Sequence, residues 1–168
     1  YFLRSILTEY DKEKFNIYLY LNSKYEDETT SELKRYVHST KNIVDLNDLS
    51  AINLIRKDQI DIVIDLNGFS SNHRLTLFKN RIAPIQISWL AYLNTTGIDT
   101  IDYLLVDNNL VKNNEINFYG EKILKLPNIW NSHAGFKYER KYNELPFLKK
   151  KTFTFGSLNN FRKISDET

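Results

Sequence analysis

Five short runs of apolar, β-prone residues recur through the chain, and stretches with helical spacing separate several of them. The runs are Phe15–Leu21, Asn42–Leu46, Ile60–Leu66, Pro84–Leu90 and Asp102–Val106. Runs of this kind favour strands that are buried on both faces of a sheet. Amphipathic stretches at Asp27–Val37, Asp48–Asp58 and Asn72–Asn80 favour helices. Alternating strands and helices therefore predict an α/β fold, a parallel Rossmann-like sheet with helices on both faces.

The sequence after residue 106 is less regular, and it predicts a second structural unit near its end. A short strand is expected at Lys122–Leu126 within a stretch of loops. A new strand is expected at Phe153–Phe155, then a turn, and a helix that opens near Ser165. This pattern predicts a boundary between residues 145 and 151, with domains at 1–148 and 149–168.

Composition excludes several classes of protein. The 42% hydrophobic content suits a packed core, and no apolar run approaches the roughly 20 residues that span a bilayer. The absence of cysteine excludes disulfide scaffolds and thiolate metal sites. A net charge of +2 from interspersed charges is unlike the basic footprint of a nucleic-acid binder. We therefore expect a cytoplasmic protein with no metal, no cofactor, and neither nucleic acid nor membrane as partner.

The three histidines and the two ends of the chain complete this picture. His38, His73 and His133 are scattered without the spacing of metal ligands. The chain contains no methionine, and it ends on residues typical of the first turn of a helix. We expect an internal part of a longer protein.

Three segments follow predicted strands, where α/β sheets bind ligands. The first is Asp65–Ser71, in which Gly68 permits a tight turn or the close approach of a ligand; a simple capping turn is the alternative. The second is Trp89–Gly97, which could line a cleft or could be an ordinary polar turn. The third is Gly156–Lys163, whose amides and cations suit a diphosphate, although a surface position for Lys163 is the common outcome.

Five motifs in order give the chain a family resemblance. They are IDIVIDLNGF, IAPIQ followed by WLAY, TTG followed by IDYLLVD, EKILKLPNIW and TFGSLNNFRKISDET. Together they resemble the catalytic region of the O-linked N-acetylglucosamine transferase/SPINDLY family, in its bacterial form. The resemblance implies a GT-B architecture of two Rossmann-like halves. This chain would supply most of the N-terminal half and the first strand and turn of the C-terminal half.

The resemblance also implies a function and site residues. The full protein would transfer N-acetylglucosamine from UDP-GlcNAc to serine or threonine of a protein, with no metal. Lys163 falls on the lysine that contacts the donor diphosphate, and Asn160 falls on a donor-site amide. Positions on the acceptor side or lining the cleft are Asn67, Gly68, Phe69, Ser71, Leu90 and Leu93.

Departures from the family pattern leave alternatives open. Ala91 and Leu93 replace a glycine and a proline, and Ser71 replaces a lysine of the animal enzymes. The family's histidine motif and its tetratricopeptide repeats would lie upstream of Tyr1, so we expect this chain alone to be inactive. Alternatives are a non-catalytic Rossmann-like binding module, a SPINDLY-like fucosyltransferase that uses GDP-fucose, and another GT-B enzyme.

Overall fold

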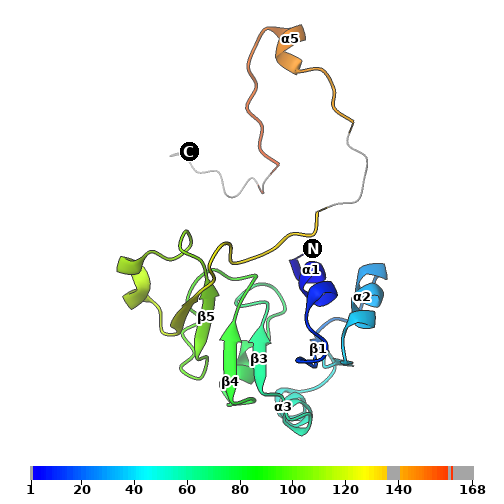
Figure 1. Cartoon of the computed structure of the whole chain (residues 1–168), viewed down its shortest axis with the longest axis vertical. Coiled ribbons are helices and arrows are strands. Elements are labelled where there is room, and N and C mark those ends of the chain that lie inside the picture. Colours follow the sequence, from blue (N-terminus) through cyan, green and yellow to red (C-terminus); the bar gives the residue numbers. More distant parts are fainter. Residues whose placement is uncertain (1, 136–140, 159, 161–168) are drawn as a thin grey trace. The chain divides into compact units, whose positions relative to one another are not determined.

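The fold is described from a computed structural model that covers residues 2–135, 141–158 and 160 (Figure 1). By its internal contacts the chain divides into two units, Tyr1–Gly135 and Phe136–Thr168. The boundary expected between residues 145 and 151, with domains at 1–148 and 149–168, stays a prediction.

The first unit alternates helices and strands, as the sequence predicts. Its helices are α1 (Phe2–Glu9), α2 (Glu28–Leu33), α3 (Asp48–Lys57) and α4 (Leu75–Phe78), with 3-10 turns η1 (Lys34–Tyr36) and η2 (Asn113–Phe118). Its strands are β1 (Tyr18–Leu21), β2 (Ser39–Asn42), β3 (Ile62–Asp65), β4 (Ile85–Ser88), β5 (Tyr103–Val106) and β6 (Lys122–Lys125). The α/β class is confirmed.

Among the described residues, all strand pairs are parallel, and they form two sheets. One sheet has the order β1-β2, and the other has the order β3-β4-β5-β6. In the larger sheet Val63 lies opposite Gln86, and Leu104 lies opposite Ile123. Parallel strands place their carboxyl ends at one edge, so the loops that follow them meet there.

Helix α3 shows why the sequence folds as it does. The side chain of Asn47 accepts a hydrogen bond from the backbone N–H of Ser50 at 2.8 Å, which caps the first turn. Ala51, Ile52 and Ile55 recur at helical spacing and are buried. They join Val63 and residues of α4 and the following loop in the main core; its buried members are Ile43, Ala51, Ile52, Ile55, Val63, Leu75, Leu77, Phe78, Ile82, Ala83 and Ile101.

The two faces of the larger sheet differ. The face that carries Val63 and Leu104 is buried. On the opposite face Ile62, Ile64 and Leu124 are 41–47% exposed in the described part of the chain. Within the described part of the first unit, helices therefore cover one face of this sheet, while the other face exposes Ile62, Ile64 and Leu124.

Three elements differ from the sequence prediction. Strand β2 begins at Ser39 rather than Asn42, because Ser39–Asn42 pair in register with β1 and leave Ile43 to enter the core. Helix α4 starts later than predicted, since Asn72 has a left-handed backbone (φ 61°) that a helix does not accept. Helix α1 was not predicted.

The second unit contains helix α5 (Pro146–Lys150) within the stretch where a linker was predicted. Proline at its first turn and left-handed Lys151 (φ 54°) explain its two ends. The strand predicted at Phe153–Phe155 is not formed. No described strand pairs with it, Phe153 instead stacks on Phe147, and Phe155 is 97% exposed. The helix expected near Ser165 lies outside the described residues.

Candidate functional site

The candidate site lies in the first unit, at the edge formed by the carboxyl ends of the strands. Loops that follow β1, β2 and β3 surround a pocket of about 510 Å³. Ligands of open α/β sheets bind at this edge. The pocket is lined by Asn22, Ser23, Lys24, Tyr25, Val44, Leu46, Asp48, Asn72, His73 and Arg74.

Asp65 organises the loop after β3. Its carboxylate is buried and accepts hydrogen bonds from the backbone N–H groups of Gly68 at 2.7 Å and Asn67 at 3.4 Å. Burial raises the pKa of Asp65 above its ordinary value, while the two N–H donors oppose that rise. The side chain of Asn67 is also used inside the loop, donating to the backbone oxygen of Ser71 at 3.0 Å. Asp65 and Asn67 therefore shape the turn.

Gly68 brings the first two predicted segments into contact. Its φ of 54° lies in the left-handed region, and a Cβ there would lie 2.0 Å from the Cβ of Tyr92. No side chain fits in that space, so glycine permits both the turn and the close approach. The sequence predicted such a role for the glycine but did not identify Tyr92 as the group that approaches it.

Aromatic side chains line the surface where the two loops meet. The ring of Phe69 contacts Tyr92 edge to face at 5.3 Å and His73 at 5.6 Å between centroids. Phe69 and Leu93 are each about half exposed, at 49% and 48%. Leu90 has a φ of 89°, which is rare for a branched residue, and such strain tends to occur at functional sites.

A buried acid fixes the far end of the second loop. Glu121, just before β6, is 4% exposed and accepts hydrogen bonds from the hydroxyl of Thr95 at 2.7 Å and the N–H of Thr96 at 2.6 Å. The hydroxyl of Thr96 also donates to Glu121. Sequence reasoning missed this role, although the EKILKLPNIW motif contains the glutamate.

Trp89 and Asp107 hold the segment around Trp130 at the same edge. The indole N–H of Trp89 donates to the backbone oxygen of Trp130 at 2.7 Å. Asp107, which follows β5, accepts from the N–H of Trp130 at 3.0 Å. Hydrogen bonds from backbone N–H groups, that of Leu110 foremost, hold the pKa of Asp107 below its ordinary value.

Arg74 ties the pocket together, and it was also missed. Its guanidinium donates to the backbone oxygens of Ile43 at 3.2 Å and Leu46 at 3.1 Å, and to the carboxylate of Asp48 at 2.8 Å. A fourth bond of 3.3 Å reaches the side-chain oxygen of Asn22. One side chain thus joins the loops after β1, β2 and β3. A hydrogen bond from Thr76, supplemented by Arg74, keeps the pKa of Asp48 low.

The structure describes only part of the third predicted segment, Gly156–Lys163. Asn160 is a described residue of the second unit, and Lys163 lies outside the described residues.

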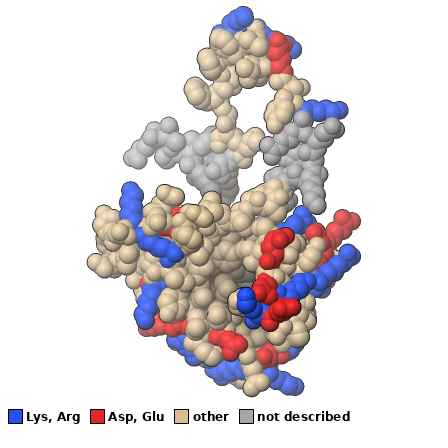
Figure 2. All heavy atoms as spheres, in the orientation of Figure 1, with Lys and Arg blue, Asp and Glu red and all other residues tan. Residues whose placement is uncertain are grey.

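Within the described ranges, no group of three or more histidine and acidic side chains could hold a metal ion. The helices of that same part of the chain are too short or too polar to cross a membrane. On the face shown in Figure 2, acidic and basic side chains are mixed.

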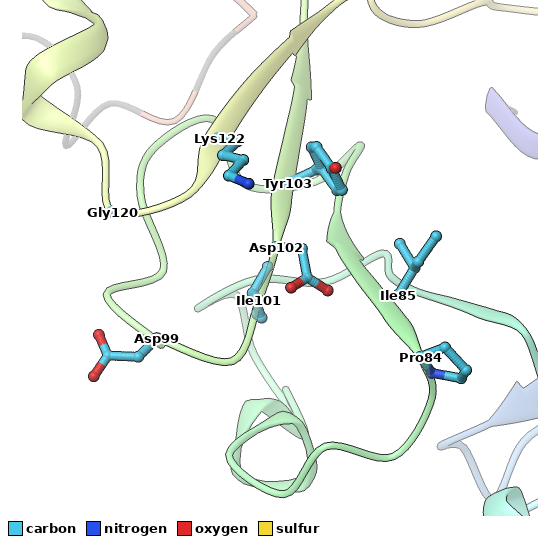
Figure 3. A pocket seen from close by; sticks show the side chains of 8 residues that line it. All are labelled: Pro84, Ile85, Asp99, Ile101, Asp102, Tyr103, Gly120 and Lys122. Atoms are coloured by element: carbon cyan, nitrogen blue, oxygen red, sulfur yellow. The ribbon is translucent and has the colours of Figure 1, made fainter.

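A second pocket, of about 360 Å³, lies at the amino ends of β4, β5 and β6 (Figure 3). Its most central acid, Asp102, already pairs with Arg81 at 2.5 Å and accepts the N–H of Gln86 at 2.8 Å. Figure 3 shows the carboxylate of Asp99 directed away from Asp102. This pocket lies at the edge of the sheet opposite to the candidate site, and the carboxylate of Asp102 is already paired within the protein.

Residues 1–152 match the profile of glycosyl transferase family 41. The chain belongs to that family. A probable UDP-N-acetylglucosamine–peptide N-acetylglucosaminyltransferase SPINDLY of Eustoma exaltatum subsp. russellianum is 30% identical over 169 residues, which cover 98% of this chain and 18% of the relative. The SPINDLY protein of Arabidopsis thaliana is 28% identical over the same shares.

A solved structure also matches this chain. A mutant of the Thermobaculum terrenum O-GlcNAc transferase superposes with a TM-score of 0.76 and is 33% identical. The match covers 78% of this chain and 25% of that one. The chain therefore spans about a fifth to a quarter of the length of these family 41 relatives.

Proposed function

We propose that the protein containing this chain transfers N-acetylglucosamine from UDP-GlcNAc to serine or threonine of a protein. Family 41 membership supports a glycosyl transferase, and the names of the relatives specify this donor and a peptide acceptor. The observation that carries the proposal is the meeting of the Asp65–Ser71 and Trp89–Gly97 loops at the ligand-binding edge of the sheet.

In the proposed reaction, the acceptor hydroxyl attacks the anomeric carbon of the sugar. A new carbon–oxygen bond forms, the bond to the diphosphate breaks, and UDP and a proton are released. Lys163 would offset the charge that develops on the departing diphosphate. Asn160 would contact the donor.

The acceptor would lie against the loops of the first unit. The half-exposed Phe69 and Leu93 present apolar surface there, and Leu90 lies at the start of the second loop. Ser71 is exposed and uncharged, so this acceptor surface would lack the positive charge of the animal enzymes. Asn67 and Gly68 would act indirectly, by fixing the loop that carries Phe69.

The proposal includes the setting of the reaction. Transfer would need no metal ion, the protein would be cytoplasmic, and tetratricopeptide repeats elsewhere in the polypeptide would recruit the acceptor. Full transfer in the presence of excess EDTA would agree with the first point, and its loss on chelation would contradict it.

The test compares two lysine variants of the full-length polypeptide. Labelled UDP-GlcNAc is incubated with acceptor protein, and incorporation is measured for wild type, Lys163→Ala and Lys150→Ala. Removing one preorganised charge-stabilising group typically costs roughly 100- to 1,000-fold in rate, so we expect that loss for Lys163→Ala. Lys150 is an exposed residue of α5, and its variant should keep wild-type activity.

Each contrary outcome has a definite meaning. Unchanged transfer by a folded Lys163→Ala protein would remove the role assigned to that lysine. Labelling from GDP-fucose but not from UDP-GlcNAc would replace the proposed donor by the SPINDLY-like alternative. A folded full-length protein that transfers neither sugar would favour the non-catalytic binding module.

A further inference from the structure

The connection from β4 to β5, residues 89–102, contains no helix. Parallel strands need a crossover of about a dozen residues or more, and an α-helix usually supplies it. Within the described residues of the first unit, every other connection between successive strands contains an α-helix or a 3-10 turn. The crossover from β4 to β5 therefore lacks the internal hydrogen bonds that hold a helix together, and other groups must fix its path.

The last part of this crossover is fixed by the core. The side-chain amide of Gln86 donates to the backbone oxygen of Thr100 at 2.7 Å. Ile101 is buried and belongs to the main core. Residues 98–102 are therefore anchored by groups that have no contact with the candidate site.

The first part of the crossover, residues 90–97, has one anchor. The carboxylate of Glu121 accepts the hydroxyl of Thr95 at 2.7 Å and the N–H of Thr96 at 2.6 Å, and the hydroxyl of Thr95 accepts the N–H of Gly120 at 3.3 Å. Among the described residues, every hydrogen bond that leaves the crossover from residues 90–97 ends on Glu121 or Gly120. Hydrogen bonds to a carboxylate are stronger than those between neutral groups, so Glu121 is the main anchor.

This anchor lies at the edge of the sheet opposite to the candidate site. Glu121 directly precedes β6, and its neighbour Gly120 lines the pocket at the amino ends of the strands (Figure 3). The same stretch of chain reaches the carboxyl ends of the strands at Tyr92, which packs against Gly68. Residues 90–97 therefore connect the two edges of the sheet, with Glu121 at one end and the contact of Tyr92 at the other.

We propose that Glu121 is a positioning residue for the acceptor side of the candidate site. By holding the two threonines at the amino ends of the strands, its carboxylate fixes where Tyr92 and Leu93 lie at the carboxyl ends. The inference rests on the proposed function, which places the acceptor against this loop. It adds a residue that touches neither substrate and that sets the affinity for the acceptor.

The expected effect follows from the chemistry of the substitution Glu121→Gln. It keeps one acceptor oxygen and replaces the other by an NH2 group that cannot accept a hydrogen bond. Only the fraction of protein with an ordered loop binds the acceptor, and a hydrogen bond to a charged group shifts such an equilibrium by roughly 10- to 100-fold. We expect the KM for the acceptor to rise about 10-fold. The KM for the donor should not change, because Asn160 and Lys163 belong to the second unit.

Steady-state kinetics of the full-length polypeptide measure both values beside two controls. Glu115→Gln removes an acid of η2 that accepts the N–H of Lys112 at 2.9 Å, and both KM values should stay at wild type. Ile55→Val weakens the main core beneath α3, so it should lower the Tm and keep the wild-type KM for the acceptor. A wild-type acceptor KM for Glu121→Gln, or an equal rise for Ile55→Val, would overturn the proposal.

Thr96→Val tests whether Glu121 acts through the loop. It removes a hydroxyl that donates to Glu121 and keeps the shape of the side chain. Residues that act through each other are not additive, so the double variant should have an acceptor KM close to that of Glu121→Gln alone. A rise equal to the product of the two single effects would contradict the proposal, because it indicates independent actions.

A second measurement needs no activity. The buried N–H of Gly68 donates to Asp65 at 2.7 Å, and Tyr92 packs against the same glycine. If the anchor positions Tyr92, its loss should expose this N–H to solvent. Hydrogen exchange of the full-length polypeptide, followed by mass spectrometry, measures the effect on the segment 67–71.

We expect segment 67–71 to exchange several-fold faster in Glu121→Gln and at the wild-type rate in Glu115→Gln. Faster exchange confined to residues 95–98 would overturn the proposal, because the effect would then end at the anchor. The two proposals fail in different ways. Without the proposed function the wild type transfers no sugar and the exchange result alone decides the positioning role, whereas without that role transfer is intact and Glu121→Gln matches the wild type.

Discussion

Gly68 offers a sharp test of whether the two loops of the candidate site pack as described. Replacing it by alanine places a Cβ 2.0 Å from the Cβ of Tyr92 and 2.6 Å from its Cγ. Those separations are far inside van der Waals contact, so the loops after β3 and β4 must move apart. The same substitution also forces an L-residue into the left-handed region at a φ of 54°.

Gly97 separates these two effects. It has a similar φ of 64°, but no atom lies within 4 Å of the position of its Cβ. Gly97→Ala should therefore cost only the left-handed backbone, roughly 1–2 kcal/mol. Gly68→Ala adds overpacking of about 1–3 kcal/mol, so its total cost should be about 2–5 kcal/mol.

The assay is urea unfolding followed by tryptophan fluorescence. The chain has two tryptophans, Trp89 and Trp130. The indole N–H of Trp89 donates a hydrogen bond to the backbone oxygen of Trp130, so both lie beside the loops. Equal destabilisation by Gly68→Ala and Gly97→Ala would refute the reasoning, since only the backbone would then matter. In the Gly68→Ala background, Tyr92→Gly should restore part of the loss. Tyr92→Ala should not, because it keeps the Cβ that clashes.

Three further predictions concern polar groups that are buried or half-buried. Gln86 is fully buried and bonds to Phe78, Ile82 and Thr100, so Gln86→Leu should cost about 2–4 kcal/mol by stranding buried backbone groups; the exposed Gln59→Leu is the control, and equal unfolding midpoints in urea would contradict the prediction. The pKa of Asp65 is raised by burial, so its contribution to stability falls as pH rises from 3.8 through the raised value, and Asp65→Asn should lose that slope. The pKa of Asp102 is lowered, chiefly by Arg81, so its contribution is lost as pH falls below 3.8, and Asp102→Asn should lose that acid limb. Unfolding midpoints from pH 3 to 7 check both signs, and unchanged profiles would show that neither group is linked to folding.

Much of the sheet could be predicted from the sequence, because apolar runs such as Ile60–Leu66 and Pro84–Leu90 contain β3 and β4. Strand β2 could not, since its residues Ser39–Asn42 are polar. Pairing with β1, rather than propensity, selects them. The prediction of a strand at Phe153–Phe155 was wrong for the opposite reason. Its residues suit a strand, but no described strand lies beside it to pair with it.

Some residues of the candidate site could likewise be predicted from the sequence, and others could not. Asp65, Gly68 and Phe69 could be predicted because polar and small residues that follow a buried run mark the loops of the ligand-binding edge. Arg74 and Glu121 could not be predicted, because their partners are distant in sequence. Those of Arg74 lie 26 to 52 positions away, and those of Glu121 lie 25 to 26 positions away. The link between the first two segments and the region of Asn160 and Lys163 stays a prediction.

The buried carboxylate of Glu121 ties the evolution of two distant segments together. It has two hydroxyls and one N–H as partners, and it pairs with no cation among the described residues. Loss of either side would leave the other buried and unsatisfied. Across family 41, acid at this position and hydroxyls at the positions of Thr95 and Thr96 should therefore be gained and lost together. A family member that keeps the acid without the hydroxyls, or the hydroxyls without the acid, should have a different conformation in the loop that corresponds to Trp89–Gly97.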